Sequence, residues 1–414
     1  MTRNPTDSDC RMDSTEKLFL EALRCGVAGQ PVPWTEEPDG ATQIALVRLA
    51  RAQALQPVIA HAISGCPAMD GSGALAALKR EARAVTVHQA TRTAEFLLLL
   101  RELEARGLRP AVIKGAVCRS LYPEPEQRPS SDEDILIASE DFPAYHRALL
   151  DCGLQLLRTE EPLTDPDEVT YVDPDRDLYL ELHMRLFPSD SAAYGDCNRF
   201  LEGALDRRVR VSVYGQTLET LHPTDHLLFL LCHAYKHILH GGVGIRQICD
   251  LCLFARRYEA EIDWSPVRRA AEELRIETLS AAFFRMGERH LGIPGPKAFS
   301  DLKPDEKPLL HDCLTGGLYG ADDPDRLHSS NLTLEAVSAE RQGRRSKGAM
   351  RALFLPAESL AGRFPYLYKR PWLLPVAWVQ RVWGYVFRER SKPKNTLQIG
   401  RERIELLRQY GILS

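Results

Sequence analysis

AVIKGAVCRSLYPEPEQRPSSDEDILIA, residues 111–138, is the segment of this 414-residue chain with the clearest structural pattern. It opens with a short β-branched apolar run that predicts a strand, which Lys114 and Gly115 end. Small and helix-favouring residues follow, and three prolines then prevent the helix from continuing. The acidic run DED and Ile135–Ile137 predict a second strand. The segment therefore predicts two strands joined by a short helix and a loop.

Two aspartates open the second predicted strand. Asp132 and Asp134 lie two residues apart, so their side chains share one face and Glu133 points away. Two carboxylates aimed at one place repel each other unless a cation lies between them, and oxygen ligands suit Mg²⁺. The glycine at the start of the preceding helix could offer N–H groups to a phosphate. This pattern predicts a metal site beside a phosphate cradle, although exposed aspartates at a strand end are the common alternative.

A third acidic residue lies in the segment DLYLELHMRL, residues 177–186. Its apolar residues alternate with polar ones, which predicts a strand with Glu181 and His183 on the polar face. That face could lie beside the two aspartates and complete the metal site. The alternative is a solvated polar face on an edge strand.

A histidine-rich helix is predicted from Thr224 to about residue 240. Its four histidines share one face, and they favour either a cleft lining together with Lys236, satisfied core positions, or a zinc site. The four are His226, His233, His237 and His240. In the next predicted helix, Arg246 and Asp250 lie four residues apart and could form a structural pair or contact substrate.

Composition restricts the class of protein. The net charge of −4 gives no general attraction to nucleic acid. The N-terminus has no apolar signal core, and no apolar run is long enough to span a bilayer, so we expect a cytoplasmic protein. The ten cysteines are then expected to be reduced thiols, most of them buried.

The order of predicted elements indicates an α+β fold. A small mixed β-sheet core would lie between an N-terminal helical region and a mainly helical C-terminal half. The predicted division is 1–14 disordered, 15–107 helical, 108–222 sheet core, 223–295 helical, and 296–414 helical with a basic and aromatic tail.

Several of these segments together resemble an uncharacterised bacterial nucleotidyltransferase family of the polymerase-beta-like superfamily. The resemblance rests on IKGAVCRSLY (113–122), SSDEDILI (130–137), LELHMRLF (180–187), HAYKHILHGGVGIRQICDL (233–251) and FPYLYKRPWLLPVAW (364–378). Lys114-Gly115 stands where the superfamily has a Gly-Ser or Gly-Gly pair. The resemblance implies the sheet core as a nucleotidyltransferase domain and an enzyme of the EC 2.7.7 type.

The resemblance also implies site roles. Two Mg²⁺ ions would be held by Asp132, Asp134 and Glu181, which are also the expected catalytic residues, with an NTP such as ATP as substrate. His183 could orient the acceptor or Glu181. The residues expected to contact the nucleotide are Lys114, Gly115, Arg119, Arg128 and Ser131. Substrate or structural roles are expected for His183, His233, Lys236, His237, Arg246 and Asp250.

The acceptor and two alternative functions stay open. The acceptor would be the hydroxyl of a small molecule, a natural product or a protein, and no nucleic-acid partner is expected. The altered Gly-Ser position favours a non-catalytic or antitoxin-like partner protein, whereas the intact set of three carboxylates favours an enzyme. The basic and aromatic tail at 363–394 could touch a membrane surface or pack on the body of the protein.

Overall fold

The computed structural model defines most of the chain. It describes residues 12–69, 71–158, 163, 166–318, 324–344, 360, 364–388 and 396–414. Most of the disordered N-terminus predicted for 1–14 lies outside the described residues, and the first helix begins at Ser14. Within the described parts, each helix is too short or too polar to cross a bilayer.

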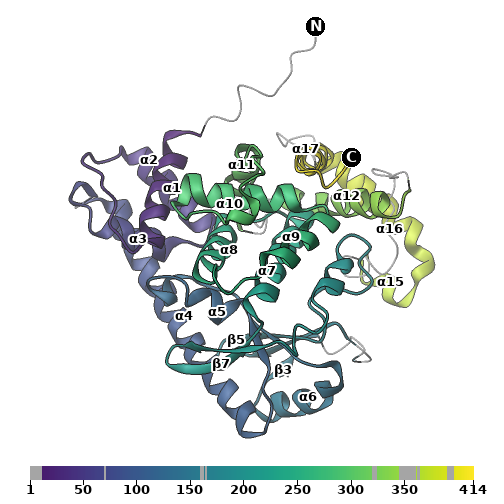
Figure 1. The fold of residues 1–414 in the computed structure, drawn as a ribbon. Coiled ribbons are helices and arrows are strands. Elements are labelled where there is room, and N and C mark those ends of the chain that lie inside the picture. The colour runs from purple at the N-terminus through teal and green to yellow at the C-terminus, as the bar shows by residue number, and fades with distance from the viewer. Residues whose placement is uncertain are drawn as a thin grey trace.

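Four helices form the N-terminal region, which is purple to blue in Figure 1. They are α1 (Ser14–Val27), α2 (Gly40–Ala52), α3 (Gln56–Ser64) and α4 (Gly73–Ala105). A capping box between Asp13 and Glu16 starts α1, and the Asp39 side chain caps α2. Helices α2 and α3 are separate because the chain breaks near Ala54, whose φ of 50° is incompatible with a continuous helix.

The chain then enters a mixed seven-stranded sheet with the order β3-β4-β5-β2-β1-β7-β6. Its strands are β1 (Ala111–Ile113), β2 (Glu133–Leu136), β3 (Gln155–Leu156), β4 (Glu168–Asp173), β5 (Leu178–His183), β6 (Val209–Val213) and β7 (Gln216–Thr220). The short helix α5 (Gly115–Arg119) follows β1, and α6 (Phe142–Asp151) follows β2. The two strands predicted around the aspartates are neighbours in this sheet, and β2 pairs in parallel with β5.

A layer of helices lies above the sheet in Figure 1. It contains α7 (Pro223–His240), α8 (Ile245–Arg257), α9 (Trp264–Glu273) and α10 (Glu277–Leu291). One hydrophobic cluster extends through these helices, the sheet and the N-terminal helices. The fold is therefore α+β, with the sheet between two helical regions of the sequence.

The last part of the chain is helical where it is described. It contains α11 (Lys307–Gly316), α12 (Pro324–Arg341), α15 (Tyr366–Lys369), α16 (Leu374–Arg388) and α17 (Thr396–Gln409). Residues 345–354, which follow α12, lie outside the described part. The buried Arg403 of α17 donates hydrogen bonds to the carbonyls of Ile238 and His240, which end α7.

Candidate functional site

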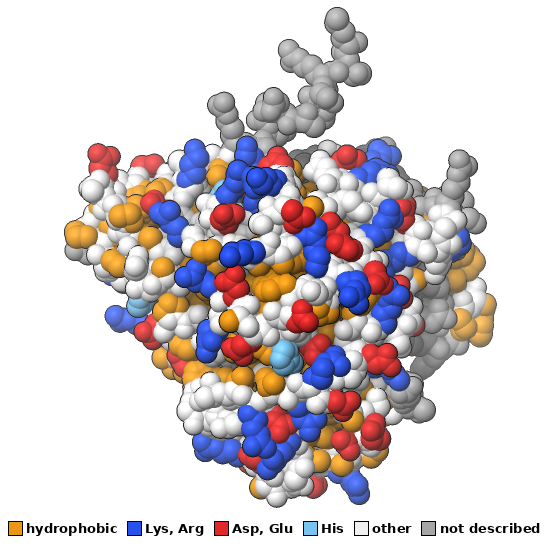
Figure 2. Space-filling view, viewed as in Figure 1, with side chains coloured by type: hydrophobic (Ala, Val, Ile, Leu, Met, Phe, Trp, Pro, Cys, Tyr) orange, Lys and Arg blue, Asp and Glu red, His pale blue; other side chains and the backbone are white. Residues whose placement is uncertain are grey.

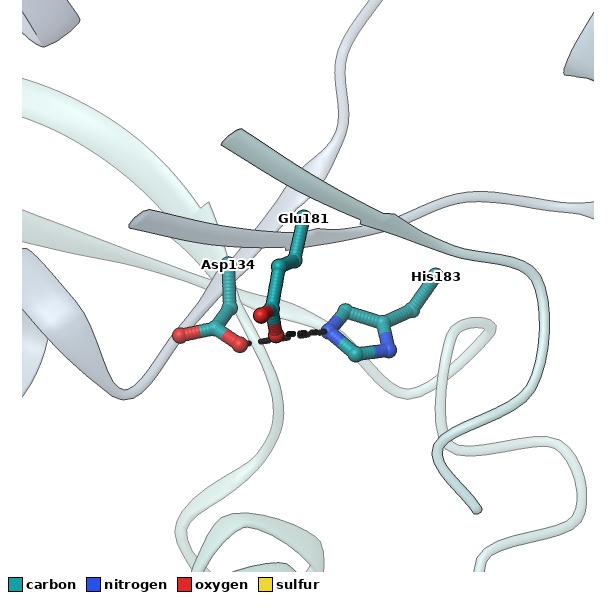
Figure 3. Close-up of side chains that lie close together, drawn as sticks. All are labelled: Asp134, Glu181 and His183. Carbon is teal, nitrogen blue, oxygen red and sulfur yellow. Dashed lines mark hydrogen bonds and ion pairs between the residues drawn. The ribbon is translucent and has the colours of Figure 1, made fainter. Parts of the chain in front are cut away.

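Strands β2 and β5 bring three polar side chains together. In their parallel register, Asp134 lies opposite Glu181 and Leu136 opposite His183. Figure 3 shows both carboxylates beside the imidazole. His183 Nε2 lies 3.1 Å from Asp134 Oδ1 and 3.6 Å from Glu181 Oε2. The ligand atoms of all three residues lie within 4.8 Å of one another, a spacing that fits a single metal ion.

The cluster perturbs the ionisation of its own members. Burial alone would lower the pKa of His183, but its hydrogen bonds to Asp134 and Glu181 outweigh burial and raise that pKa to about 9. Burial tends to raise the pKa of Glu181, but the hydrogen bond to His183 and the charge of Lys114 lower it below its ordinary value. His183 is therefore a cation at neutral pH when the site holds no metal.

Glu168 of β4 completes the surroundings of the imidazole. It lies opposite His183 in the β4–β5 register, with Oε2 3.5 Å from His183 Nδ1. His183 is 4% exposed, and the buried Nδ1 makes no hydrogen bond within the described structure. A metal-binding histidine usually directs its other ring nitrogen at a carboxylate or carbonyl. Two carboxylates and an imidazole backed by Glu168 therefore fit a divalent metal ion.

Asp132 lies at the mouth of the same cluster, in the residue directly before β2. It is half-buried, and Ser131 Oγ lies 3.3 Å from its Oδ1. Asp132, Glu181 and Glu168 line a groove of about 410 Å³. This volume lies within the range of small-molecule sites. The structure thus brings Asp132, Asp134 and Glu181 to one place, with a groove beside them.

Lys114 reaches the cluster from the end of β1. Its Nζ lies 2.8 Å from Asp134 Oδ1 and 3.1 Å from His233 Nε2 on α7. His233 Nε2 is in turn 3.2 Å from His237 Nε2. Burial and then the charge of Lys114 hold the pKa of both histidines well below the ordinary range, so both are neutral. Lys236, half-buried on the same helix, adds to this lowering.

Arg119 and Gly115 both lie against the carboxylate of Glu133. Glu133 does point away from the aspartates, as expected, and its Oε1 forms an ion pair of 2.5 Å with the fully buried Arg119. Its Oε2 accepts from the Ala116 amide at 3.2 Å, and a Cβ on Gly115 would collide with it. The expectation that Gly115 and Arg119 contact a nucleotide does not fit this arrangement, because a carboxylate of the chain fills the proposed cradle.

Arg128 is also enclosed. Its Nη2 lies 2.5 Å from Asp250 Oδ2, both side chains are buried, and Tyr122 donates to Asp250 Oδ1 at 2.8 Å. Arg246 donates instead to the Pro129 carbonyl. Of the two alternatives for Arg246 and Asp250, the structural pair is not formed, because Asp250 pairs with Arg128 and so joins the loop before β2 to α8. A nucleotide contact by Arg128 does not fit its burial.

The other histidines of α7 have separate partners. His226 Nε2 accepts from the Lys114 amide at 3.3 Å, and its Nδ1 lies 3.2 Å from Thr220 Oγ1. His240 Nε2 lies 3.0 Å from the Tyr194 hydroxyl. These two histidines occupy satisfied positions, and the zinc alternative for all four does not fit the geometry of α7.

Sequence reasoning missed Glu168 altogether and did not propose His183 as a metal ligand. The alternating pattern of β4 shows which side chains share a face with Glu168, but it does not predict which strand pairs with β4. The register with β5 is what places Glu168 opposite His183.

The family match agrees with this geometry. Residues 39–292 match the model of a family described as uncharacterised nucleotidyltransferases, which is more than half of the chain. The chain belongs to this nucleotidyltransferase family. No curated protein and no solved structure matches it. Membership supports a transferase that acts on a nucleotide, and the matched residues include the whole sheet and the cluster of Asp134, Glu181 and His183.

Proposed function

We propose that this nucleotidyltransferase moves a nucleoside monophosphate from an NTP to a hydroxyl acceptor in a Mg²⁺-dependent reaction. The observation that carries the proposal is the convergence of Asp134, Glu181 and His183 from two neighbouring parallel strands. These three residues would hold the metal, with Asp132 beside them and Glu168 orienting His183. Bound Mg²⁺ would neutralise the phosphate charge that builds up during transfer.

The residues of the chain position the two substrates. The acceptor oxygen would form a bond to the α-phosphorus as the bond to the leaving pyrophosphate breaks, and the acceptor proton would leave through the groove. Asp132, Ser131 and Glu181 line this groove and would orient the acceptor or nucleotide there. The Lys114 ammonium, 2.8 Å from Asp134, would lie against the phosphates. Arg119, Arg128, Gly115 and Asp250 would act by holding the loop and the strands in place.

Nucleic acid is not the acceptor that we propose. On the face shown in Figure 2, basic and acidic side chains are intermixed and form no continuous basic field. A small molecule, natural product or protein hydroxyl fits the groove and the net charge of −4. We also propose that the protein acts in the cytoplasm.

Nucleotide binding tests the function directly. Titration calorimetry with ATP, GTP, CTP and UTP and Mg²⁺ would compare the wild type with Asp134→Asn and Glu181→Gln, and the exposed Glu140→Gln would be the matched control. We expect Mg²⁺-dependent binding of at least one nucleotide by the wild type and the control, and at least a ten-fold loss in both site variants. Folded wild-type protein that binds none of the four would instead favour a non-catalytic partner protein.

The C-terminal tail supports a second, separate proposal of peripheral membrane contact. Val376, Val379 and Trp383 are 46%, 65% and 64% exposed, and their spacing of 3 and 4 places them on one face of α16. Trp372, in the turn directly before α16, is 71% exposed. Figure 1 places α15 and α16 at the right edge of the molecule, and Figure 2 shows hydrophobic side chains at that edge. The sequence from 360 to 388 contains five Lys or Arg and no acidic residue, which favours an anionic lipid surface.

Liposome flotation distinguishes membrane contact from packing of the tail on the body of the protein. Full-length protein should float with vesicles containing anionic lipid, whereas Trp372→Ser/Trp383→Ser should stay in the soluble fraction. Equal partitioning of the two proteins would show that these tryptophans do not bind lipid.

A further inference from the structure

Lys114 has a backbone conformation that side chains rarely adopt. Its φ is 52° and its ψ is −121°, a region that glycine enters freely and that strains other residues. The amide of Lys114 is held by His226 Nε2, and its carbonyl accepts from the Cys118 amide at 2.9 Å. Glycine would suit this turn without strain. Since the chain carries a lysine here, the use of the side chain has to be sought in its contacts.

The ammonium group occupies a defined place in the acidic cluster. The Lys114 side chain is 15% exposed, and its Nζ lies between Asp134 Oδ1 at 2.8 Å and His233 Nε2 at 3.1 Å. An ammonium group only donates hydrogen bonds, so His233 Nε2 has to be the acceptor. Phe229 lies on the same side, with its ring centroid 5.9 Å from Nζ. A carboxylate, a neutral imidazole and an aromatic ring thus hold one positive charge next to Asp134.

This charge lies against the carboxylate that a second metal ion would have to share. Two ions in a two-metal site lie about 3.5–4 Å apart and share a carboxylate, which gives one oxygen to each ion. Oδ1 of Asp134 already contacts Lys114 Nζ at 2.8 Å and His183 Nε2 at 3.1 Å. Its other carboxylate oxygen points away from the imidazole in Figure 3. Oδ1 of Asp134 is therefore already neutralised by groups of the chain itself, which leaves the other oxygen for a metal ion.

We propose that Lys114 takes the place of one of the two metal ions that the family resemblance implies, so that the site holds a single divalent cation. The inference rests on the proposed metal-dependent function and specifies its cofactor. The lysine supplies a fixed positive charge beside the transferring phosphate, and the strained turn after β1 aims that charge at Asp134. Removal of the ammonium should open the position to a second ion.

Counting bound Mn²⁺ tests the inference without any assay of activity. Electron paramagnetic resonance would measure the Mn²⁺ bound by full-length wild type, Lys114→Met and Lys114→Gly, with the exposed Lys297→Met as the matched control. Lys114→Gly relieves the backbone strain and keeps the test valid if the methionine variant folds poorly. Circular dichroism would confirm that each protein is folded.

We expect one Mn²⁺ in the wild type and in the control, and two in each Lys114 variant, with the added ion bound at least ten-fold more tightly than any second ion in the wild type. Equal counts in the wild type and a folded Lys114 variant would overturn the inference. If ions are bound in equal number, the proposed metal-dependent function still stands. If none of the proteins binds Mn²⁺, both that function and the role of Lys114 are wrong.

Discussion

Replacing Arg119 by methionine should destabilise the protein by about 3–5 kcal/mol, the usual cost of leaving one member of a buried ion pair without its partner. Arg119 is 0% exposed, and its guanidinium lies 2.5 Å from Glu133 Oε1 and 2.5 Å from Ser130 Oγ. After the substitution, Glu133 would keep the Ala116 amide, 3.2 Å from Oε2. Burial already raises the pKa of Glu133, so the unpaired carboxyl will take up a proton, which limits the loss.

Urea unfolding followed by circular dichroism would measure this loss. The control is Arg106→Met, because Arg106 pairs at 3.0 Å with Asp151 and the two side chains are 41% and 66% exposed. Such a surface pair contributes about 0–1 kcal/mol. The double variant Arg119→Met/Glu133→Met should recover part of the stability, and nucleotide binding by folded Arg119→Met should match the wild type. A loss in Arg119→Met no larger than in Arg106→Met would refute the structural role of this pair.

Three further predictions concern stability. The raised pKa of His183, from 6.5 to about 9, contributes about 3 kcal/mol to the free energy of unfolding, which is fully present below pH 6.5 and lost as pH rises through 9. In urea unfolding with EDTA present, His183→Gln should remove this pH dependence. An unchanged pH profile would contradict the assignment. Gly115→Ala should lower stability by about 1–3 kcal/mol, because its φ is 23° and its Cβ would meet the Glu133 carboxylate, whereas Gly73→Ala, which meets nothing, should lose none in thermal melts. Arg403→Met should cost about 1–3 kcal/mol and speed amide exchange at the end of α7, since buried carbonyls lose their donor; unchanged exchange there would count against this contact.

Local pattern was enough to predict the sheet strands that carry the site. The apolar run before Lys114, the alternation around Glu181 and the spacing of Asp132 and Asp134 each correspond to an observed strand or its edge. The parallel pairing of β2 with β5 then brings these carboxylates together. Period-two alternation fixes which side chains share a face, so the polar faces could be identified before the pairing was known.

Partners that are distant in sequence could not be predicted in the same way. Arg119 is 14 residues from Glu133, and Arg128 is 122 residues from Asp250. A basic residue beside a glycine-containing turn looks the same in sequence whether it faces a phosphate or a buried carboxylate. Burial distinguishes the two cases, and burial depends on how α8 and the loop before β2 pack against each other. The orientation of Lys114 likewise depends on a strained turn that local propensity does not predict.

The contact between Arg403 and the end of α7 has a consequence for how the protein is made. Arg403 follows Ile238 by 165 residues, so a ribosome adding about 5–20 residues per second completes this contact roughly 10–30 s after α7 has been synthesised. Until then, the helix that carries His233 and His237 ends in carbonyls without this donor. A nascent chain therefore passes through a period in which the end of the helix beside Lys114 is not yet stabilised by Arg403. A premature stop codon shortly before α17 would make that state permanent.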